Sequence, residues 1–300
     1  MKREIVFQAF NTEVNKIIEN LEMIKSQGFT IILLSPIQGL KEPLLQDNLN
    51  WFILYQPTNF KIGNQLCCKS ELIELCIKAH QLGLKVYVDT VLHHVANFKG
   101  NDVSPLVDGE ITRLGYLWYE SSFRNIINYD NYYEATHNSL GGLPALNLQN
   151  FDIRKMQFAF LNELKECGCD GVRFDAVRHM SVDHNYFQEM VETVGKEFID
   201  KSFGEMIEIH DDNIFDLYKP FMHIFTDKWL NDERFYIKIY SHDDANTFNK
   251  EFKNEKIFLD EYEYVMQTFD KSNVLYYCYN IEKDTIWKSD RMKYLNEAYN

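Results

Sequence analysis

Short apolar runs alternate with amphipathic stretches over most of the chain. Residues 5–10 are mostly apolar and rich in strand-forming types, and residues 13–27 repeat apolar side chains at helical spacing up to Gly28. Residues 29–34 form a second apolar run, which Ser35 and Pro36 end. A strand, a helix and a strand in this order predict a parallel crossover unit.

The same alternation continues towards the C-terminus. Helices are predicted over residues 70–82, 153–166 and 183–199, and strands over residues 84–88, 169–174, 202–206, 221–225, 235–240 and 274–278. Eight strands alternating with helices, nearly all parallel, predict a (β/α)8 TIM barrel, whose active site lies at the carboxyl ends of the strands. The alternative is an open doubly wound sheet, but no glycine-rich phosphate fingerprint follows the first or second strand, which counts against nucleotide binding.

One segment interrupts this regular pattern. Residues 98–148 have weak periodicity and many Asn, Gly, Tyr and Ser residues. An irregular insertion of this length is usually functional. We therefore expect one catalytic barrel over residues 1–300 with a reduced insertion subdomain at residues 98–148.

Composition narrows the classes of partner. A 300-residue chain with 45% hydrophobic and 25% charged residues is typical of a soluble globular protein. Its net charge of −14 argues against nucleic acid and anionic membranes as partners. The six cysteines form no C-x-x-C pair, so zinc is not expected and free buried thiols are. With no apparent signal peptide or membrane-spanning run, we expect a cytoplasmic protein.

Candidate chemistry begins at the end of the fourth predicted strand. Arg173 and Asp175 flank Phe174, so their side chains point the same way along a strand. Arg173 would keep Asp175 ionised and oriented, as a covalent nucleophile requires. A buried structural ion pair explains the same two residues equally well.

Other polar residues follow neighbouring strands. They are Asp89 and His94 after strand three, His179 after strand four, Glu205 at strand five, and His242 and Asp243 after strand seven. Singly, each has a structural explanation, such as a turn cap for Asp89 or a core position for His94. A barrel mouth would crowd the acids together, and like charges in one cleft keep one carboxyl protonated as an acid.

Four ordered motifs carry a family resemblance. They are Asp89-Thr-Val-Leu-His-His94, Gly171-Val-Arg-Phe-Asp-Ala-Val-Arg-His179, Gly204-Glu205 and His242-Asp243. Together they resemble the α-amylase family of glycoside hydrolases, over nearly the whole chain. The resemblance implies a retaining mechanism with the catalytic carboxyls roughly 5–5.5 Å apart.

The resemblance also implies individual roles. Asp175 would be the nucleophile, Glu205 the general acid and base, and Asp243 the residue that stabilises the transition state. The remaining substrate-binding positions would be Tyr55, Asp89, His94, Arg173, Arg178, His179 and His242. Among these, Tyr55 would stack on the sugar, and Asp89 with Arg173 would orient Asp175.

The chain departs from the family pattern in several places. His93 stands where the family usually has a calcium-binding Asn, and Ala145 replaces an Asp in Leu143-Pro-Ala-Leu-Asn147. Because calcium prefers oxygen ligands, we expect no metal and no cofactor. Arg178 replaces a frequent Lys, and the β-sandwich that usually follows the barrel is not expected.

The leading hypothesis is a retaining hydrolase acting on α-1,4-linked glucan or maltooligosaccharides. A glycan-binding or regulatory homologue without turnover is the second hypothesis, motivated by His93 and Ala145, and an α-glucan transferase is a further alternative. A structural barrel with fortuitous acids ranks last. The oligomeric state is left open.

Overall fold

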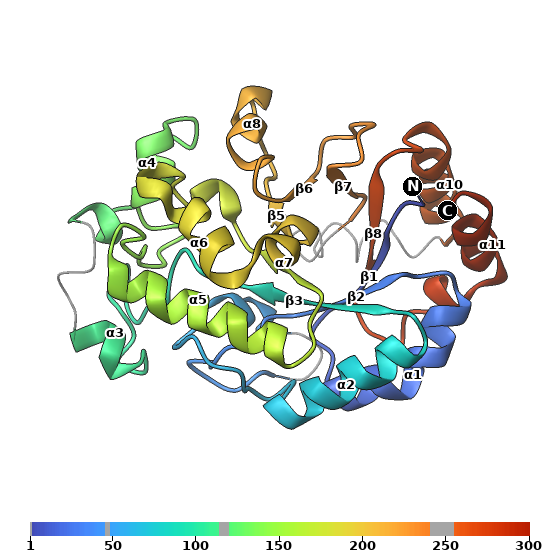
Figure 1. Ribbon diagram of the computed structural model, residues 1–300, viewed down its shortest axis with the longest axis horizontal. Coiled ribbons are helices and arrows are strands. Elements are labelled where there is room, and N and C mark those ends of the chain that lie inside the picture. Colours follow the sequence, from blue (N-terminus) through green and yellow to red (C-terminus); the bar gives the residue numbers. More distant parts are fainter. Residues whose placement is uncertain (1, 46–48, 114–119, 241–254) are drawn as a thin grey trace.

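A closed barrel of eight parallel strands forms the centre of the molecule (Figure 1). The computed structural model describes residues 2–45, 49–113, 120–240 and 255–300. The strands are β1 (Ile5–Ala9), β2 (Ile31–Leu34), β3 (Lys85–Thr90), β4 (Gly171–Phe174), β5 (Phe203–Glu205), β6 (His223–Thr226), β7 (Phe235–Lys238) and β8 (Asn273–Cys278). Each strand pairs with the next in chain order, and β8 closes the barrel against β1.

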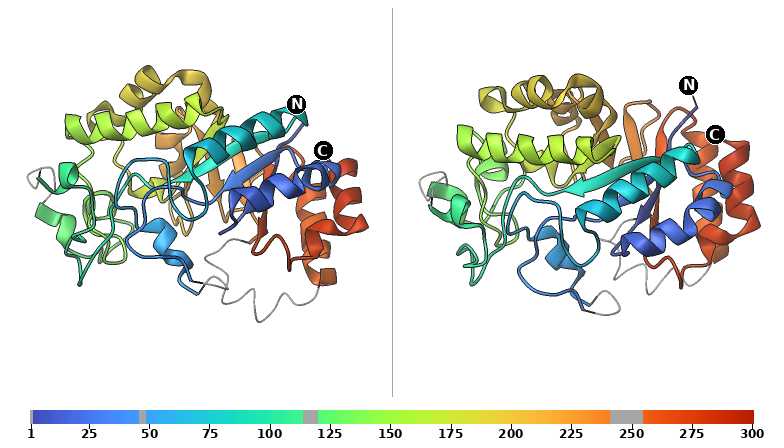
Figure 2. Two further views of the ribbon diagram at one scale, coloured as in Figure 1. Left: turned by 90° about the horizontal axis from the view of Figure 1, so that it is seen from below. Right: turned by 60° about the horizontal axis from the view of Figure 1, so that its bottom comes forward.

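Helices surround the strands (Figures 1 and 2). They are α1 (Val14–Ser26), α2 (Lys69–Gln81), α3 (Gly109–Arg113), α4 (Tyr132–His137), α5 (Phe151–Glu166), α6 (Tyr186–Val194), α7 (Lys196–Lys201), α8 (Phe215–Tyr218), α10 (Glu255–Thr268) and α11 (Asp290–Ala298). The longer ones bury apolar stripes, as α1 does with Val14, Ile17, Leu21 and Ile24. Both figures place α3 and α4 at the end of the molecule away from α10 and α11.

The barrel interior is filled by aromatic rings. The ring of Phe203 on β5 stacks on Tyr236 of β7 with centroids 4.4 Å apart, and Tyr87 of β3 lies 6.0 Å from Phe203. Gly171 makes room for them, because a Cβ at this position would lie 2.8 Å from the Tyr87 ring. Since side chains alternate along a strand, the residues two places beyond Tyr87, Gly171 and Phe203 also point inwards.

The predicted (β/α)8 barrel is therefore confirmed, and every predicted strand is present with small shifts in its ends. One helix prediction was wrong. The helix expected over residues 183–199 is two helices, α6 and α7, which meet at Gly195. Gly195 has φ 112°, which no helical residue adopts, so the chain turns there.

The insertion is built from loops and short helical turns. It carries α3 and α4 together with a 3-10 turn at Glu120–Phe123, and isolated bridges join Asn97 to Val103 and Leu140 to Leu143. Its start lies beside its end, because Val95 N donates to Pro144 O at 3.2 Å. Whether residues 98–148 act as a separate subdomain stays a prediction.

All six thiols are free, but the expectation that they are buried was wrong for Cys68, which is exposed next to Ser70. Cys68 precedes α2 and caps it, so its side chain lies at the surface. Over the described ranges of the chain, no helix has the length and apolar character needed to cross a bilayer.

The close packing of Gly204 gives a test of the barrel wall. A Cβ added at Gly204 would lie 2.5 Å from Val177 Cγ1 and 2.9 Å from Met222 Sδ. We expect Gly204→Ala to lower the free energy of unfolding by about 1–3 kcal/mol in urea titrations, because a packed interior resists added volume. Gly109→Ala is the matched control, since its Cβ would meet no atom within 4 Å. Equal effects of the two substitutions would contradict this packing.

Candidate active site

One guanidinium lies at the centre of the polar layer above the aromatic rings. Asp89 of β3 and Arg173 of β4 are partners in the strand register. Arg173 Nη1 donates to Asp89 Oδ1 at 2.6 Å and to Oδ2 at 2.5 Å. The Tyr55 hydroxyl donates to Asp89 Oδ2 at 3.0 Å, so Asp89 is held from two sides.

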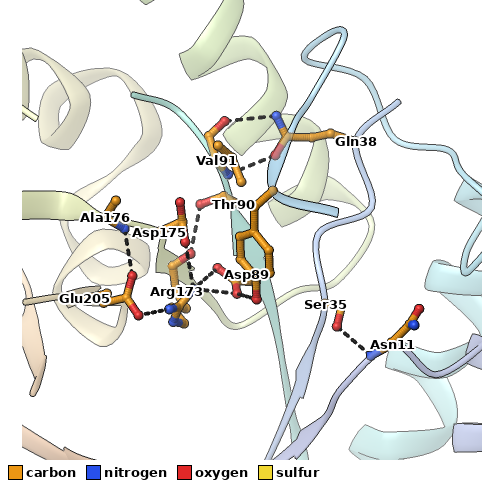
Figure 3. Close-up of polar contacts among 11 residues, drawn as sticks. Asn11, Ser35, Gln38, Asp89, Thr90, Val91, Arg173, Asp175, Ala176 and Glu205 are labelled. Carbon is orange, nitrogen blue, oxygen red and sulfur yellow. Dashed lines mark hydrogen bonds and ion pairs between the residues drawn. The ribbon is translucent and has the colours of Figure 1, made fainter. Parts of the chain in front are cut away.

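Glu205 completes the other side of this cluster (Figure 3). Arg173 Nη2 donates to Glu205 Oε1, and the backbone N–H of Ala176 donates to Glu205 Oε2 at 3.1 Å. Ala176 adopts the left-handed conformation, with φ 49° and ψ 40°, which is rare for a residue with a side chain. Such strained residues cluster at functional sites, and this one places an amide donor on Glu205.

Asp175 lies just beyond the end of β4. Its backbone N–H donates to Thr90 O at 2.9 Å, and its Oδ1 lies 3.4 Å from Arg173 Nη1. Arg173 thus contacts Asp175 as expected, but its closer partners are Asp89 and Glu205. Asp89 and Glu205 lie closer to Arg173 because they belong to the strands on either side of it, whereas Asp175 follows the end of β4.

The charges of this layer determine its electrostatics. Arg173 is only 1% exposed. Burial opposes its charge, but Asp89, Glu205 and Asp175 together raise the pKa of Arg173 above its ordinary value. Three carboxylates thus surround this one guanidinium.

A cavity of about 470 Å³ opens above this layer. Among the sequence-predicted site residues, its walls include Tyr55, His94, Asp175, Arg178, His179 and Glu205. Asp89 and Arg173 do not line it and instead support those that do. The structure thus brings six of the predicted residues to one cavity and two more beneath it.

His94 and His179 lie in the cavity wall, and each neutral ring donates one hydrogen bond. His94 Nε2 donates to Tyr55 O at 2.9 Å, and His179 Nδ1 donates to Ala135 O at 2.7 Å. Burial lowers the pKa of His94 to about 4 and the pKa of His179 to about 3. Each ring therefore has its second nitrogen as an acceptor at neutral pH.

The residues at the family's calcium position do not fit a calcium ion. His93 is fully buried, its Nδ1 lies 3.3 Å from His94 Nδ1, and its Nε2 has no hydrogen-bond partner. A β-bridge pairs His94 with Ala145, so the two departures from the family pattern are close in space. An imidazole and a methyl group supply no oxygen ligand. Across the described residues, no group of three or more His, Cys, Asp or Glu side chains is arranged to hold a metal ion.

Arg178 connects separate segments of the cavity wall by hydrogen bonds. Its Nη1 donates to Ile207 O at 3.0 Å and to Glu208 O at 3.1 Å, and its Nη2 donates to Tyr129 O at 3.0 Å. It therefore joins the loop after β5 to the insertion. His242 and Asp243 lie outside the described residues, so their predicted roles stay predictions.

Several residues of the site were not singled out from the sequence. Trp51, Phe52 and Tyr129 line the cavity, and Glu208 adds another acid. The aromatic content of the two irregular segments, residues 36–64 and 98–148, was the available signal. Nothing in the sequence indicated which of those aromatic residues face the cavity.

Gln38 is a further residue that the sequence did not reveal. Its Oε1 accepts from Val91 N at 2.9 Å and its Nε2 donates to Val91 O at 3.0 Å (Figure 3). A buried side-chain amide thus pairs with the backbone between Asp89 and His94. This contact fixes the segment that carries both residues.

Comparison with known proteins extends the sequence resemblance. No protein-family model matches the chain. An α-amylase of Clostridium acetobutylicum is 28% identical over 236 residues, which cover 74% of this chain and 30% of that protein. The chain is therefore similar in sequence to proteins named α-amylase.

Solved structures of α-amylases and of a glucanotransferase share the fold. An Anoxybacillus α-amylase matches with a TM-score of 0.76 at 17% identity, covering 99% of this chain and 78% of that chain. A cyclomaltodextrin glucanotransferase also matches at 0.76 with 16% identity over 99% of this chain and 80% of that one. An Eisenia fetida α-amylase, solved with maltohexaose, matches at 0.73 with 14% identity over 91% of this chain and 66% of that one.

The matched part of the chain spans less than a third of the length of the curated Clostridium relative.

The buried histidines predict how stability depends on pH. The folded-state pKa values of His94 and His179, about 4 and 3, lie below the unfolded value of about 6.5. The unfolded chain therefore binds more protons, and stability falls as pH drops from about 6.5 towards 4. We expect the urea midpoint of unfolding to fall over this range. Above pH 7 these two histidines should have no further effect on it.

His179→Gln provides the comparison for that titration. The variant lacks one of the titrating groups, so its free energy of unfolding should fall less steeply as pH drops below 6.5. The slope should be smaller than the parent's by up to about 1.4 kcal/mol per pH unit. Parent and variant slopes that coincide would contradict a neutral buried His179.

Proposed function

We propose that this protein is a retaining glycoside hydrolase that acts on α-1,4-linked glucan or maltooligosaccharides. The observation that carries the proposal is the convergence of Asp175 and Glu205 on Arg173 at the floor of one cavity. A catalytic pair needs one carboxyl to attack and another to transfer a proton. The kinship with proteins named α-amylase supports the choice of substrate.

Asp175 is the proposed nucleophile. It lines the cavity and follows a strand that the barrel fixes, and Arg173 lies close enough to favour its ionised form. It would attack the anomeric carbon and form a covalent glycosyl-enzyme intermediate. The predicted separation of the two carboxyls, roughly 5–5.5 Å, belongs to this mechanism and stays a prediction.

Glu205 is the proposed general acid and base. Its contacts with Arg173 and the Ala176 amide favour an ionised carboxylate. This is the form that accepts a proton from water in the second step. For the first step Glu205 must carry a proton.

The surrounding residues would orient the sugar. Tyr55 lines the cavity and its hydroxyl is fixed on Asp89, which leaves its ring as a stacking surface. His179 would accept a hydrogen bond from a sugar hydroxyl, His94 would contact the sugar with its ring while His93 faces its Nδ1, and Arg178 would hold the wall in place. In this proposal, Asp243 would stabilise the transition state and His242 would bind the sugar.

Transfer of the glycosyl group to another sugar is the second candidate. The match to a cyclomaltodextrin glucanotransferase favours considering it. Hydrolysis and transfer share the same covalent intermediate and differ only in whether water or a sugar hydroxyl accepts it. Product sizes separate the two.

Product analysis with maltoheptaose tests the proposal. We expect the parent to release products whose first-formed anomer is α, and chelator to leave turnover unchanged. Asp175→Asn and Glu205→Gln remove the nucleophile and the proton donor, so each should lower turnover by at least about 100-fold. Proton NMR of the fresh product mixture reads both the rate and the anomer.

Two surface variants serve as matched controls. Asp216→Asn and Glu197→Gln make the same chemical changes at exposed ion pairs, and should keep parental turnover. A parent that binds maltoheptaose saturably without turnover would contradict the enzyme and favour a glycan-binding protein. First-formed β products would contradict the retaining mechanism.

A further inference from the structure

Two buried glutamines hold the short segment that joins Asp89 to His94. Strand β3 ends at Thr90, and Val91 and Leu92 follow it without any exposed surface. Buried peptide groups need hydrogen-bond partners, and a segment that has left the sheet must find them elsewhere. Here side-chain carboxamides from two other parts of the chain supply them.

The first carboxamide belongs to Gln38, in the loop after β2. This side chain is 1% exposed, its Oε1 accepts from Val91 N at 2.9 Å, and its Nε2 donates to Val91 O at 3.0 Å (Figure 3). Its Nε2 also donates to Asn59 O at 3.3 Å. Both polar groups of the side chain are therefore engaged, and they fix the amide and the carbonyl of one residue.

The second carboxamide belongs to Gln157 on α5. Its Nε2 donates to Leu92 O at 2.7 Å, and its Oε1 accepts from the Tyr186 hydroxyl at 2.7 Å. None of these three residues has any exposed surface. Because the hydroxyl engages the oxygen, the amide group faces Leu92. Two consecutive residues of the segment are thus held by carboxamides from different elements.

The residues at the two ends of the segment both contact Tyr55. The Tyr55 hydroxyl donates to Asp89 Oδ2 at 3.0 Å, and His94 Nε2 donates to Tyr55 O at 2.9 Å. Tyr55 and Gln38 belong to the same loop after β2, so this loop and the segment are joined at three points. A shift of Val91 would therefore move Asp89 or His94 relative to Tyr55.

We propose that Gln38 and Gln157 are positioning residues for the candidate active site, which set the path of the chain between Asp89 and His94. The inference rests on the proposed function and extends it to two residues that do not line the cavity. A misplacement of about 1 Å at a reacting centre can cost about 100-fold in rate. Loss of either carboxamide should therefore slow turnover more than it weakens substrate binding.

Steady-state kinetics with maltoheptaose test this inference. Gln38→Met and Gln157→Met keep the length of the side chain but remove its hydrogen-bonding groups. We expect Gln38→Met to lower kcat at least about tenfold and to change KM less than about threefold, because the cavity walls still bind the sugar. Gln157→Met removes a single contact with the segment and should lower kcat about threefold or more.

Gln38→Glu supplies a rescue that depends on pH. A protonated carboxyl can accept from Val91 N and donate to Val91 O, as the carboxamide does, whereas an ionised carboxylate cannot donate. Burial raises the pKa of a carboxyl, so the protonated form is accessible near neutral pH. We expect kcat of Gln38→Glu to approach the parental value as pH falls to about 6, while Gln38→Met shows no such recovery. A Gln38→Glu variant as slow as Gln38→Met at this pH would contradict the proposed pairing.

Gln27→Met is the matched control. Gln27 is also a buried carboxamide, and its Nε2 donates to Lys288 O at 3.3 Å. It follows α1 and precedes β2, so it lies at the end of the barrel away from the cavity. We expect its removal to leave kcat and KM unchanged. Thermal melts of all variants ensure that the kinetics are measured on folded protein.

The outcomes separate this inference from the proposed function. Parental kcat in both Gln38→Met and Gln157→Met would overturn the positioning role and leave the proposed function standing. An equal loss of kcat in Gln27→Met would do the same, because it would show a general effect of removing buried carboxamides. A parent without turnover would overturn both.

Discussion

The ion-pair cluster around Arg173 is the interaction on which the rest of the site depends. A buried guanidinium is costly unless it is paired, and here the neighbouring strands supply Asp89 on one side and Glu205 on the other. The ring of Phe225 lies 5.7 Å from the guanidinium and forms part of its floor. Because β3, β4 and β5 hold these side chains, the barrel itself sets the geometry of the acids.

Loops then adapt this rigid centre to a ligand. Gln38 fixes Val91, Arg178 joins the loop after β5 to the insertion, and the Ala176 amide is turned towards Glu205 at the cost of a strained backbone. Each contact connects a segment that the sheet does not hold to one that it does. The barrel therefore determines where the cavity lies, whereas the loops form most of its walls.

The sequence predicted the barrel and much of the site because both follow simple periodicities. Apolar runs marked the strands, and strand ends marked Asp89, Arg173 and Glu205, which a parallel barrel necessarily brings together. The partners of Arg173 were less predictable, because they depend on which carboxylates lie level with the guanidinium across the barrel. The break at Gly195 was missed because the apolar pattern continues through it.

Loop contacts escaped prediction for a different reason. Nothing local marks Gln38 as the partner of Val91, or Tyr129 as a wall of the cavity, because these contacts join residues far apart in sequence with no periodic pattern. The His93 and Ala145 departures were visible individually. Their closeness became evident only when a β-bridge paired His94 with Ala145.

A double-mutant cycle between Arg173 and Asp89 tests the central claim most directly. Free energies of unfolding would be measured in urea for the parent, Arg173→Met, Asp89→Asn and the double variant. Arg173→Met leaves the buried Asp89 without its cation and should cost about 3–5 kcal/mol, whereas Asp89→Asn leaves Arg173 paired with Glu205 and should cost less. We expect the double variant to cost at least about 2 kcal/mol less than the sum of the two single variants. If the effects of the two single variants add to within about 0.5 kcal/mol, the pair is not coupled. That result would contradict the claim that this ion pair holds the site together.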